Sequence, residues 1–160
     1  MGSLEEFSGS LRLFLRAYRW RRIDPVPWQP LDKSLSECRV GIVTSAGLIE
    51  PEDEPFDKNV RGGDTSFRTI SSDVRVGDLV ECHRSQSFDH AGLELDRSLA
   101  FPILRLKELV KSGRIGSVNH RHLSFMGSIT APGRLIKRSA PEAVQLFQRD
   151  EVDVALLVPV

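Results

Sequence analysis

The stretch Glu151–Val160, EVDVALLVPV, favours one fold class over the others. It is a run of β-branched and aliphatic residues after a charged turn, which is typical of a strand buried on both faces inside a parallel sheet. In open α/β sheets the reactive groups lie just beyond the carboxyl ends of the strands. We therefore expect a reactive residue directly after Val160. The alternative is a domain that simply ends on a strand.

Other segments have the pattern of strands that would pair with this one. Short apolar runs that lead into polar or glycine-containing sequence occur at Cys38–Ser45 (CRVGIVTS), Leu79–His83 (LVECH) and His122–Met126 (HLSFM). Each is typical of a strand. The acidic stretch Glu50–Gly63, with its two prolines and paired glycines, is predicted to be a loop.

Two helices are predicted among these strands. Pro102–Lys111 has proline in its first turn and is followed by Gly113, and Ala140–Arg149 follows a capping box formed by Ser139 and Glu142. Helices thus alternate with apolar strands. This order predicts an α/β fold, an open and mostly parallel sheet with helices on its faces, preceded by an N-terminal amphipathic helix.

That first helix is expected within Leu11–Arg22, where five arginines interleave with apolar residues at helical spacing. We expect it to dock on the protein's own body or on a second subunit; a membrane surface is the alternative. The stretch Asp24–Pro30 (DPVPWQP) is predicted to be an extended tether. The predicted organisation is therefore a helix and tether over residues 1–30 and an α/β domain over residues 31–160, expected to be incomplete at its C-terminus.

Composition excludes several classes of protein. Lys+Arg and Asp+Glu both number 22 and aromatic residues make up 7%, so neither an overall field nor a stacking platform favours nucleic acid. Two cysteines without CxxC spacing argue against a disulfide scaffold. No apolar stretch reaches the roughly 20 residues of a membrane span. We expect a soluble, cytoplasmic protein.

If the sheet is parallel, polar and small residues after its strands meet at one edge. These are Ser45 and Gly47 after the first strand, His83 after the second, and Met126 and Gly127 at the end of the third. His83 is the best candidate for an acid, base or donor, because it ends a strand and Asp89 is near enough in sequence to orient it. A histidine hydrogen-bonded to backbone at a strand end is the alternative.

Two other motifs have weaker claims to a function. The stretch Gly62–Arg68 (GGDTSFR) either lines an anionic site through Arg68 or is a turn leading into an edge strand, and the turn is favoured. His120 and His122 form an HxH pair, but no third ligand stands at a recognisable spacing, so no metal is predicted. The chain has no P-loop, dinucleotide fingerprint or GxSxG elbow.

Several segments stand in a recognisable order and spacing: WQPL (28–31), CRVGIVTSAG (38–47), GDTSFR (63–68), His83 with Phe88-Asp89, FPILRLKEL (101–109), Gly113–Gly116 and HLSFMG (122–127). This ordered set resembles the selenoprotein B family of glycine, sarcosine, betaine and D-proline reductases. The likeness covers roughly Trp28–Val160 and is closest to the D-proline reductase selenocysteine subunit and its short relatives.

The resemblance implies a chemistry. In the family, a strand similar to Asp153–Val160 runs into a selenocysteine or cysteine, and a second cysteine follows after two more residues. This pair drives reductive cleavage of a C–N bond in a small amino acid or amine, and a pyruvoyl group on a separate subunit holds the substrate. The resemblance therefore implies a reductase subunit that lacks the redox pair itself, works with other reductase subunits, and has no cofactor of its own in these 160 residues. A homo-oligomer is also possible.

The same resemblance carries over four supporting residues, His83, Asp89, His122 and Gly127, without giving their individual roles. With the strand-end and loop residues described above, His83 and Asp89 are the expected catalytic residues. The expected substrate-binding residues are Ser45, Gly47, Arg68, His122, Met126 and Gly127. One departure from the family is Arg84–Ser87, which replaces a glycine pair common in the reductases and leaves the substrate open.

Two other functions stay open from the sequence. One is a non-catalytic α/β module for docking or regulation, which would use the basic N-terminal helix as its contact. The other is a metal-dependent hydrolase built on His83, His120 and His122.

Overall fold

The computed structural model describes residues 8–18, 22–85 and 88–160. The chain divides into two compact units, Met1–Pro30 and Leu31–Val160. The first unit contains helix α1 (Gly9–Ala17). Part of the predicted helix Leu11–Arg22, residues 19–21, lies outside the described residues. Docking of this helix stays a prediction.

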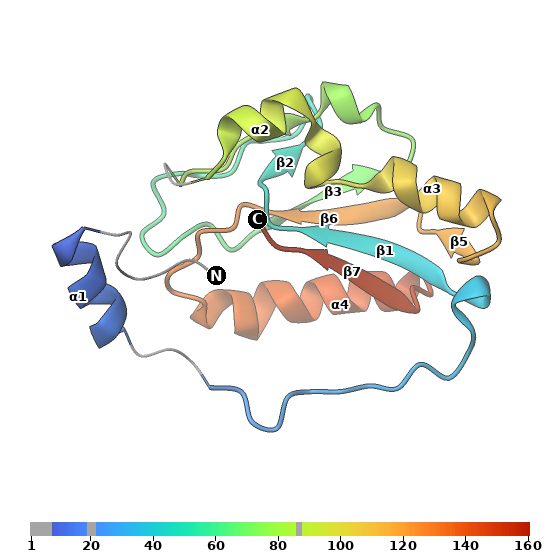
Figure 1. Cartoon of the computed structure of the whole chain (residues 1–160), viewed down its shortest axis with the longest axis horizontal. Helices are drawn as coiled ribbons and strands as arrows, with labels where there is room; N and C mark the ends of the chain where they lie inside the picture. Colours follow the sequence, from blue (N-terminus) through green and yellow to red (C-terminus); the bar gives the residue numbers. More distant parts are fainter. Residues whose placement is uncertain (1–7, 19–21, 86–87) are drawn as a thin grey trace. The chain divides into compact units, whose positions relative to one another are not determined.

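The second unit is built on a five-stranded, mostly parallel sheet (Figure 1). Its central strand is β1, which pairs in parallel with β5 and β6 on one side and with β7 on the other. Strand β3 lies beyond β6 and runs antiparallel to it. The strand bounds are β1 (Arg39–Thr44), β3 (Phe67–Ser71), β5 (Ser117–Val118), β6 (Arg121–Phe125) and β7 (Val154–Val158). The predicted α/β class and mostly parallel sheet are confirmed.

Side chains of β1 alternate between two helical layers, as the pleat of a strand requires. Val40 and Ile42 pack in one cluster with α3 (Ile103–Lys111), whereas Val43 packs in another with α4 (Ala140–Arg149). Glycine is required at position 41, because a Cβ there would come within 2.8 Å of the Phe147 ring of α4. The two predicted helices are confirmed within a residue of their bounds.

Shorter elements connect these layers. The α-helix α2 (His90–Leu95) precedes α3. The remaining elements are the 3₁₀ helices η2 (Leu35–Glu37), η3 (Val76–Asp78) and η4 (Arg97–Leu99) and the π-helical segment η5 (Leu135–Ser139). Because η5 runs directly into α4, Ser139 makes no side-chain cap, and the predicted capping box with Glu142 is wrong.

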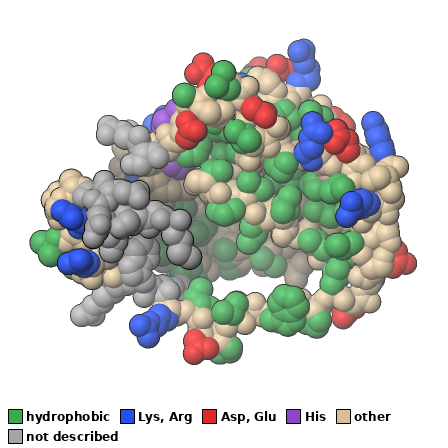
Figure 2. Space-filling model, viewed as in Figure 1, with side chains coloured by type: hydrophobic (Ala, Val, Ile, Leu, Met, Phe, Trp, Pro, Cys, Tyr) green, Lys and Arg blue, Asp and Glu red, His purple; other side chains and the backbone are tan. Residues whose placement is uncertain are grey.

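The last strand is not buried on both faces as the sequence predicts. Val154, Leu156 and Val158 pack against the core, but the side chain of Leu157 is 68% exposed. Within the described residues β7 pairs only with β1, so it is an edge strand with one covered face. Figure 2 shows hydrophobic side chains lying between charged ones on one face of the molecule.

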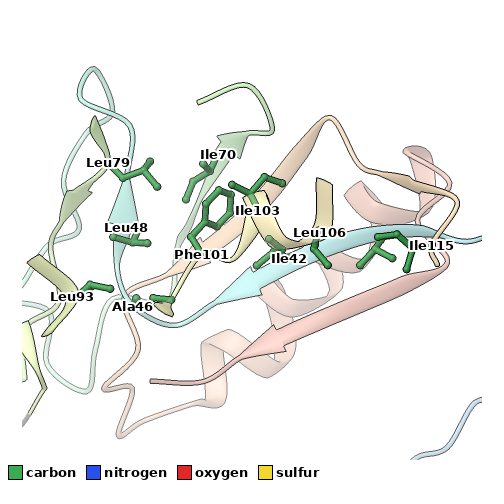
Figure 3. Close-up of a cluster of buried hydrophobic side chains, with 12 residues drawn as sticks. Ile42, Ala46, Leu48, Ile70, Leu79, Leu93, Phe101, Ile103, Leu106 and Ile115 are labelled. Carbon is green, nitrogen blue, oxygen red and sulfur yellow. The ribbon is translucent and has the colours of Figure 1, made fainter. Parts of the chain in front are cut away.

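The predicted second strand, Leu79–His83, does not join the main sheet. Only β4 (Val80–Glu81) forms there, and it pairs antiparallel with β2 (Leu48–Ile49) in a separate two-stranded sheet. The chain turns after β1 at Gly47, whose φ is +66°, and the pair with β4 forms locally. The buried side chains of Leu48 and Leu79 anchor this small sheet on the main core (Figure 3).

An ion pair between Arg121 and Asp150 stabilises the amino edge of the sheet, at which the parallel strands begin. The buried Asp150 carboxylate accepts bonds from Arg121 Nη2 at 2.6 Å and Nε at 2.8 Å, and from Asn119 Nδ2 at 3.0 Å. The Arg121 hydrogen bonds hold the pKa of Asp150 at about 2. This pair joins the turn after α4 to the start of β6.

We predict that Asp150→Asn lowers the free energy of unfolding by about 2 kcal/mol, the usual cost of losing a charged hydrogen bond. A depressed carboxyl pKa stabilises the fold above the unfolded value of about 4, and this contribution is lost as the pH falls toward 2. The variant should therefore lose part of the acid sensitivity that the unmodified chain shows. Urea unfolding between pH 2 and 7 measures both effects.

Glu151→Gln is the matched control, because the side chain of Glu151 is 84% exposed. It should change stability by less than about 0.5 kcal/mol. Equal losses in the two variants would contradict a structural role for the Asp150 pair.

Candidate active site

The carboxyl ends of β1 and β7 are tied together by Ser45. Its backbone N–H donates to the Val158 carbonyl at 3.2 Å, and its Oγ accepts from the Val160 N–H at 3.1 Å. Ser45 Oγ also lies 3.4 Å from the Val160 carbonyl oxygen, to which it donates. The end of β7 is therefore held beside the first residue that follows β1.

His83 reaches the same edge even though its strand belongs to the small sheet. The Cys82 N–H donates to the Gly47 carbonyl at 2.9 Å, which brings the next residue against the turn after β1. A Cβ at Gly47 would lie 2.9 Å from the backbone nitrogen of His83, and a Cβ at Gly127 would lie 2.9 Å from Nε2 of the His83 ring. Ser45, Gly47, His83 and Gly127 thus come together.

Met126 belongs to the floor beneath these residues. It is fully buried in a cluster with Ile49, Phe56 and Cys82. It therefore supports the edge without being open to solvent. Its predicted part in substrate binding stays a prediction.

The His83 ring is held in one tautomer. Its Nδ1 accepts a hydrogen bond from the Ser85 N–H at 3.2 Å, so the ring proton lies on Nε2. Nε2 is buried and has no hydrogen-bond partner within the described part of the chain. Burial lowers the pKa of His83, and its ring stacks on Phe88 with the centroids 4.2 Å apart. The result is a neutral imidazole with an unused donor.

Asp89 does not orient His83 as predicted. Its carboxylate caps α2 by accepting from the Gly92 N–H at 2.9 Å. The carboxylate beside His83 is Glu81, which accepts from the His83 backbone N–H and pairs with His90 Nδ1 at 2.6 Å. Sequence patterns give no signal for Glu81 and His90, because residues 81–90 contain no recognisable motif.

Arg68 is not positioned to bind an anion. Its Nε donates to the Glu54 carbonyl at 2.7 Å, its Nη2 donates to the Pro55 carbonyl at 3.3 Å, and its guanidinium lies 4.7 Å above the Phe56 ring. Arg68 therefore pins the 50–63 loop onto β3. The favoured interpretation of Gly62–Arg68, a turn leading into an edge strand, is what the structure shows.

His122 lies inside the core and not at the edge. It is fully buried, its Nδ1 accepts from the Ile42 N–H at 3.0 Å, and its ring meets Phe101 edge-on at 5.3 Å. Burial lowers the pKa of His122 to about 4, which keeps it neutral. This bond satisfies the backbone N–H of Ile42. That group lies between the part of β1 that pairs with β5 and the part that pairs with β6. This placement contradicts a direct contact with substrate.

The structure does not support a metal-dependent hydrolase. His120 is exposed and lies 4.0 Å from Asp150 at the amino edge, far along the sheet from the His83 edge. Among the residues that the structure describes, no three His, Cys, Asp or Glu side chains could hold a metal ion together. No helix in the described ranges is long and apolar enough to cross a membrane.

Two apolar hollows flank the end of β7. One, of about 510 Å³, lies on the α4 side; the other, of about 280 Å³, lies on the α2 side and reaches Val160. Residues of the first include Val43, Ser45, Phe125, Gly127, Leu135 and Leu157. Residues of the second are Phe88, Asp89, Leu93, Leu99, Ala100 and Val160. The carboxyl edge is thus bordered by space for small apolar groups.

Comparison with known proteins identifies the family. The model of Glycine/sarcosine/betaine reductase selenoprotein B matches residues 11–159. The chain belongs to this family. The match agrees with the resemblance seen in the ordered sequence segments. It also includes residues of the N-terminal helix, which that resemblance did not cover.

Two relatives are named as reductase subunits. D-proline reductase subunit gamma of Acetoanaerobium sticklandii is 31% identical over 136 residues, which is 84% of this chain and 54% of the relative. Sarcosine reductase complex component B subunit beta of Peptoclostridium acidaminophilum is 29% identical over 114 residues, 69% of this chain and 25% of the relative. The chain thus spans about half of one relative and a quarter of the other. No solved structure matches it.

We predict that Gly127→Ala disrupts the edge. A Cβ there would stand 2.5 Å from the Ser45 carbonyl oxygen, and the φ of +69° disfavours any side chain. The free energy of unfolding should fall by about 2 kcal/mol. Gly133→Ala is the control, because no atom lies within 4 Å of its added Cβ and alanine favours the helix in which it stands. Chemical denaturation measures the free energy of unfolding of both variants. Equal stability of the two would contradict the close contact between Gly127 and Ser45.

We also predict that both cysteines are unreactive in the folded chain. Cys38 and Cys82 are free and buried, and burial raises the pKa of the Cys82 thiol. Because the thiolate is the nucleophile, a thiol reagent at pH 7 should label neither quickly, and should label both in urea. Fast labelling of Cys82 in the native chain would make it a candidate redox residue.

Proposed function

We propose that this chain is the selenoprotein B-type component of an amino-acid reductase and that the carboxyl edge of its sheet binds the substrate. The observation that carries the proposal is the unused Nε2–H donor of His83, buried at the edge where β1, β6 and β7 end. Membership of the family supplies the reaction class. The relatives' names add that such proteins work as subunits of larger complexes.

The proposed reaction is reductive cleavage of a C–N bond. Two electrons and two protons from a dithiol, or from a selenol and a thiol, convert the C–N bond into C–H and N–H and leave a disulfide or selenide-sulfide. The two buried cysteines are unsuited to this task, so we propose that the redox-active pair is supplied from outside these 160 residues. A pyruvoyl group on a partner subunit is part of the same proposal.

The residues present suit a small amino acid or amine. His83 would donate a hydrogen bond from Nε2 to the substrate, and its low pKa keeps it neutral at working pH. Gly127 lets the backbone approach the His83 ring closely, and Gly47 lets it approach the His83 backbone, since a side chain at either glycine would collide with His83. The hollows beside β7 would accept the apolar part of the substrate and exclude water from it.

The test uses the complete reductase, with this chain co-expressed with its partner subunits. His83→Ala, which leaves no side-chain donor, should lower dithiol-dependent turnover of the preferred substrate among D-proline, glycine, sarcosine and betaine by about 10²-fold, the usual cost of losing a positioned donor or acid. His120→Gln is the control, because its side chain is 67% exposed at the other edge, and it should change turnover less than about twofold.

Two results would overturn the proposal. If the complex reduces none of these substrates in the presence of dithiol, the reductase assignment fails. If His83→Ala retains full turnover, His83 is structural. A complex that needs this chain for assembly but not for chemistry would favour the docking module.

A further inference from the structure

His90 faces an acceptor at each ring nitrogen. Its Nδ1 lies 2.6 Å from the Glu81 carboxylate, and its Nε2 lies 2.9 Å from the Ser85 carbonyl oxygen. A carboxylate and a carbonyl only accept, so both nitrogens must donate, which an imidazole does only in its charged form. The geometry therefore requires an imidazolium at His90, and both bonds raise its pKa above the ordinary value.

The same carboxylate reaches His83. The second oxygen of Glu81 accepts from the His83 backbone N–H, so one side chain links the backbone of His83 to the His90 cation. Phe88 stacks on His83 at 4.2 Å and meets His90 in a T-shaped contact at 5.1 Å. The two histidine rings are 6.5 Å apart. Three aromatic rings and one carboxylate form a single cluster.

The charges around this cluster come from three segments. Glu81 of β4 raises the pKa of His83, whereas the cations His90, Lys58 and Arg84 lower it, in addition to burial. Lys58 of the 50–63 loop also lowers the pKa of His90, against the Glu81 bond. Arg84 is itself held by the carbonyls of Val60 and Ser128. The bonds of His90 thus favour its charged form, whereas burial favours the neutral form of His83.

We propose that His90 and Glu81 are positioning residues that hold the His83 ring in place and keep it in its neutral, Nε2-protonated form. Glu81 fixes the backbone of His83, and the His90 cation neutralises a carboxylate that would otherwise favour a charged His83. His90 also ties down the Ser85 carbonyl, next to the Ser85 N–H that sets the His83 tautomer. The effect on turnover rests on the proposed function, whereas the protonation states do not.

The direct test is histidine-ring NMR of the isolated chain from pH 4 to 9, with each of the four histidines assigned by substitution. We expect His90 to titrate above the free-peptide midpoint of about 6.5 and His83 below it, with Nδ1 of His83 unprotonated throughout the neutral range. In His90→Gln the His83 midpoint should rise, because Glu81 is left uncompensated. In Glu81→Gln the His90 midpoint should fall.

His120→Gln is the matched control and should leave the midpoints of His83 and His90 unchanged. His90→Gln is the variant to rely on if Glu81→Gln fails to fold, because the His90 side chain is 44% exposed. The inference is overturned if His90 titrates at or below the free-peptide midpoint, or if His90→Gln leaves the His83 midpoint in place.

The assembled reductase provides an independent readout. Activity that needs neutral His83 is lost as the pH falls through its pKa, so His90→Gln should move the acid limb of the pH–rate profile to higher pH. A purely structural role would lower turnover equally at all pH values. If the NMR shifts occur but the complex has no reductase activity, the proposed function fails and the positioning role stands. If the complex is active and the acid limb of the pH–rate profile does not move in His90→Gln, the positioning role fails and the proposed function stands.

Discussion

Strand β1 is hydrogen-bonded on both sides to parallel strands, and the rest of the structure depends on this constraint. Because β6 and β7 run in its direction, all three strands end at one edge. The alternation along β1 sends Val40 and Ile42 to α3 and leaves Gly41 under the Phe147 ring of α4. The helices cover the faces and leave the carboxyl edge open for Ser45 and the His83 turn.

Burial divides the histidines into different roles. His122 is neutral because it is enclosed in the core and accepts from a backbone N–H of β1. His83 is neutral for the same reason. Nε2 of each ring has no partner among the described residues, but that of His83 lies beside Gly127 at the carboxyl edge. His90 is exposed enough to keep a charge, and Glu81 fixes that charge beside His83. Histidine thus serves as an acceptor for a backbone N–H in the core, as a buried donor without a described partner at the edge, and as a cation beside Glu81.

Local patterns predicted most of the main sheet and less of the site. The strands at Cys38–Ser45 and His122–Met126 and both long helices formed where hydrophobic spacing placed them. Leu79–His83 has the same apolar character but pairs with β2, because a strand's partner is set by tertiary packing that a single sequence does not encode. Nearness in sequence predicted Asp89 as the partner of His83, but sequence distance does not determine which carboxylate contacts a residue, and Glu81 is the one that bonds to His83.

The small sheet explains how an irregular segment becomes part of a site on a regular edge. The bond from Cys82 to the Gly47 carbonyl fixes the segment that follows β4 against the end of β1, and Gly47 itself bonds to Phe125 at the end of β6. His83 is therefore placed through its neighbour Cys82, which bonds to Gly47 beyond the end of β1, and Gly47 in turn bonds to β6. Phe88 and His90 lie beside it. A site built in this way keeps its donor on a rigid frame, and the loop sets the charge around that donor without disturbing the parallel strands.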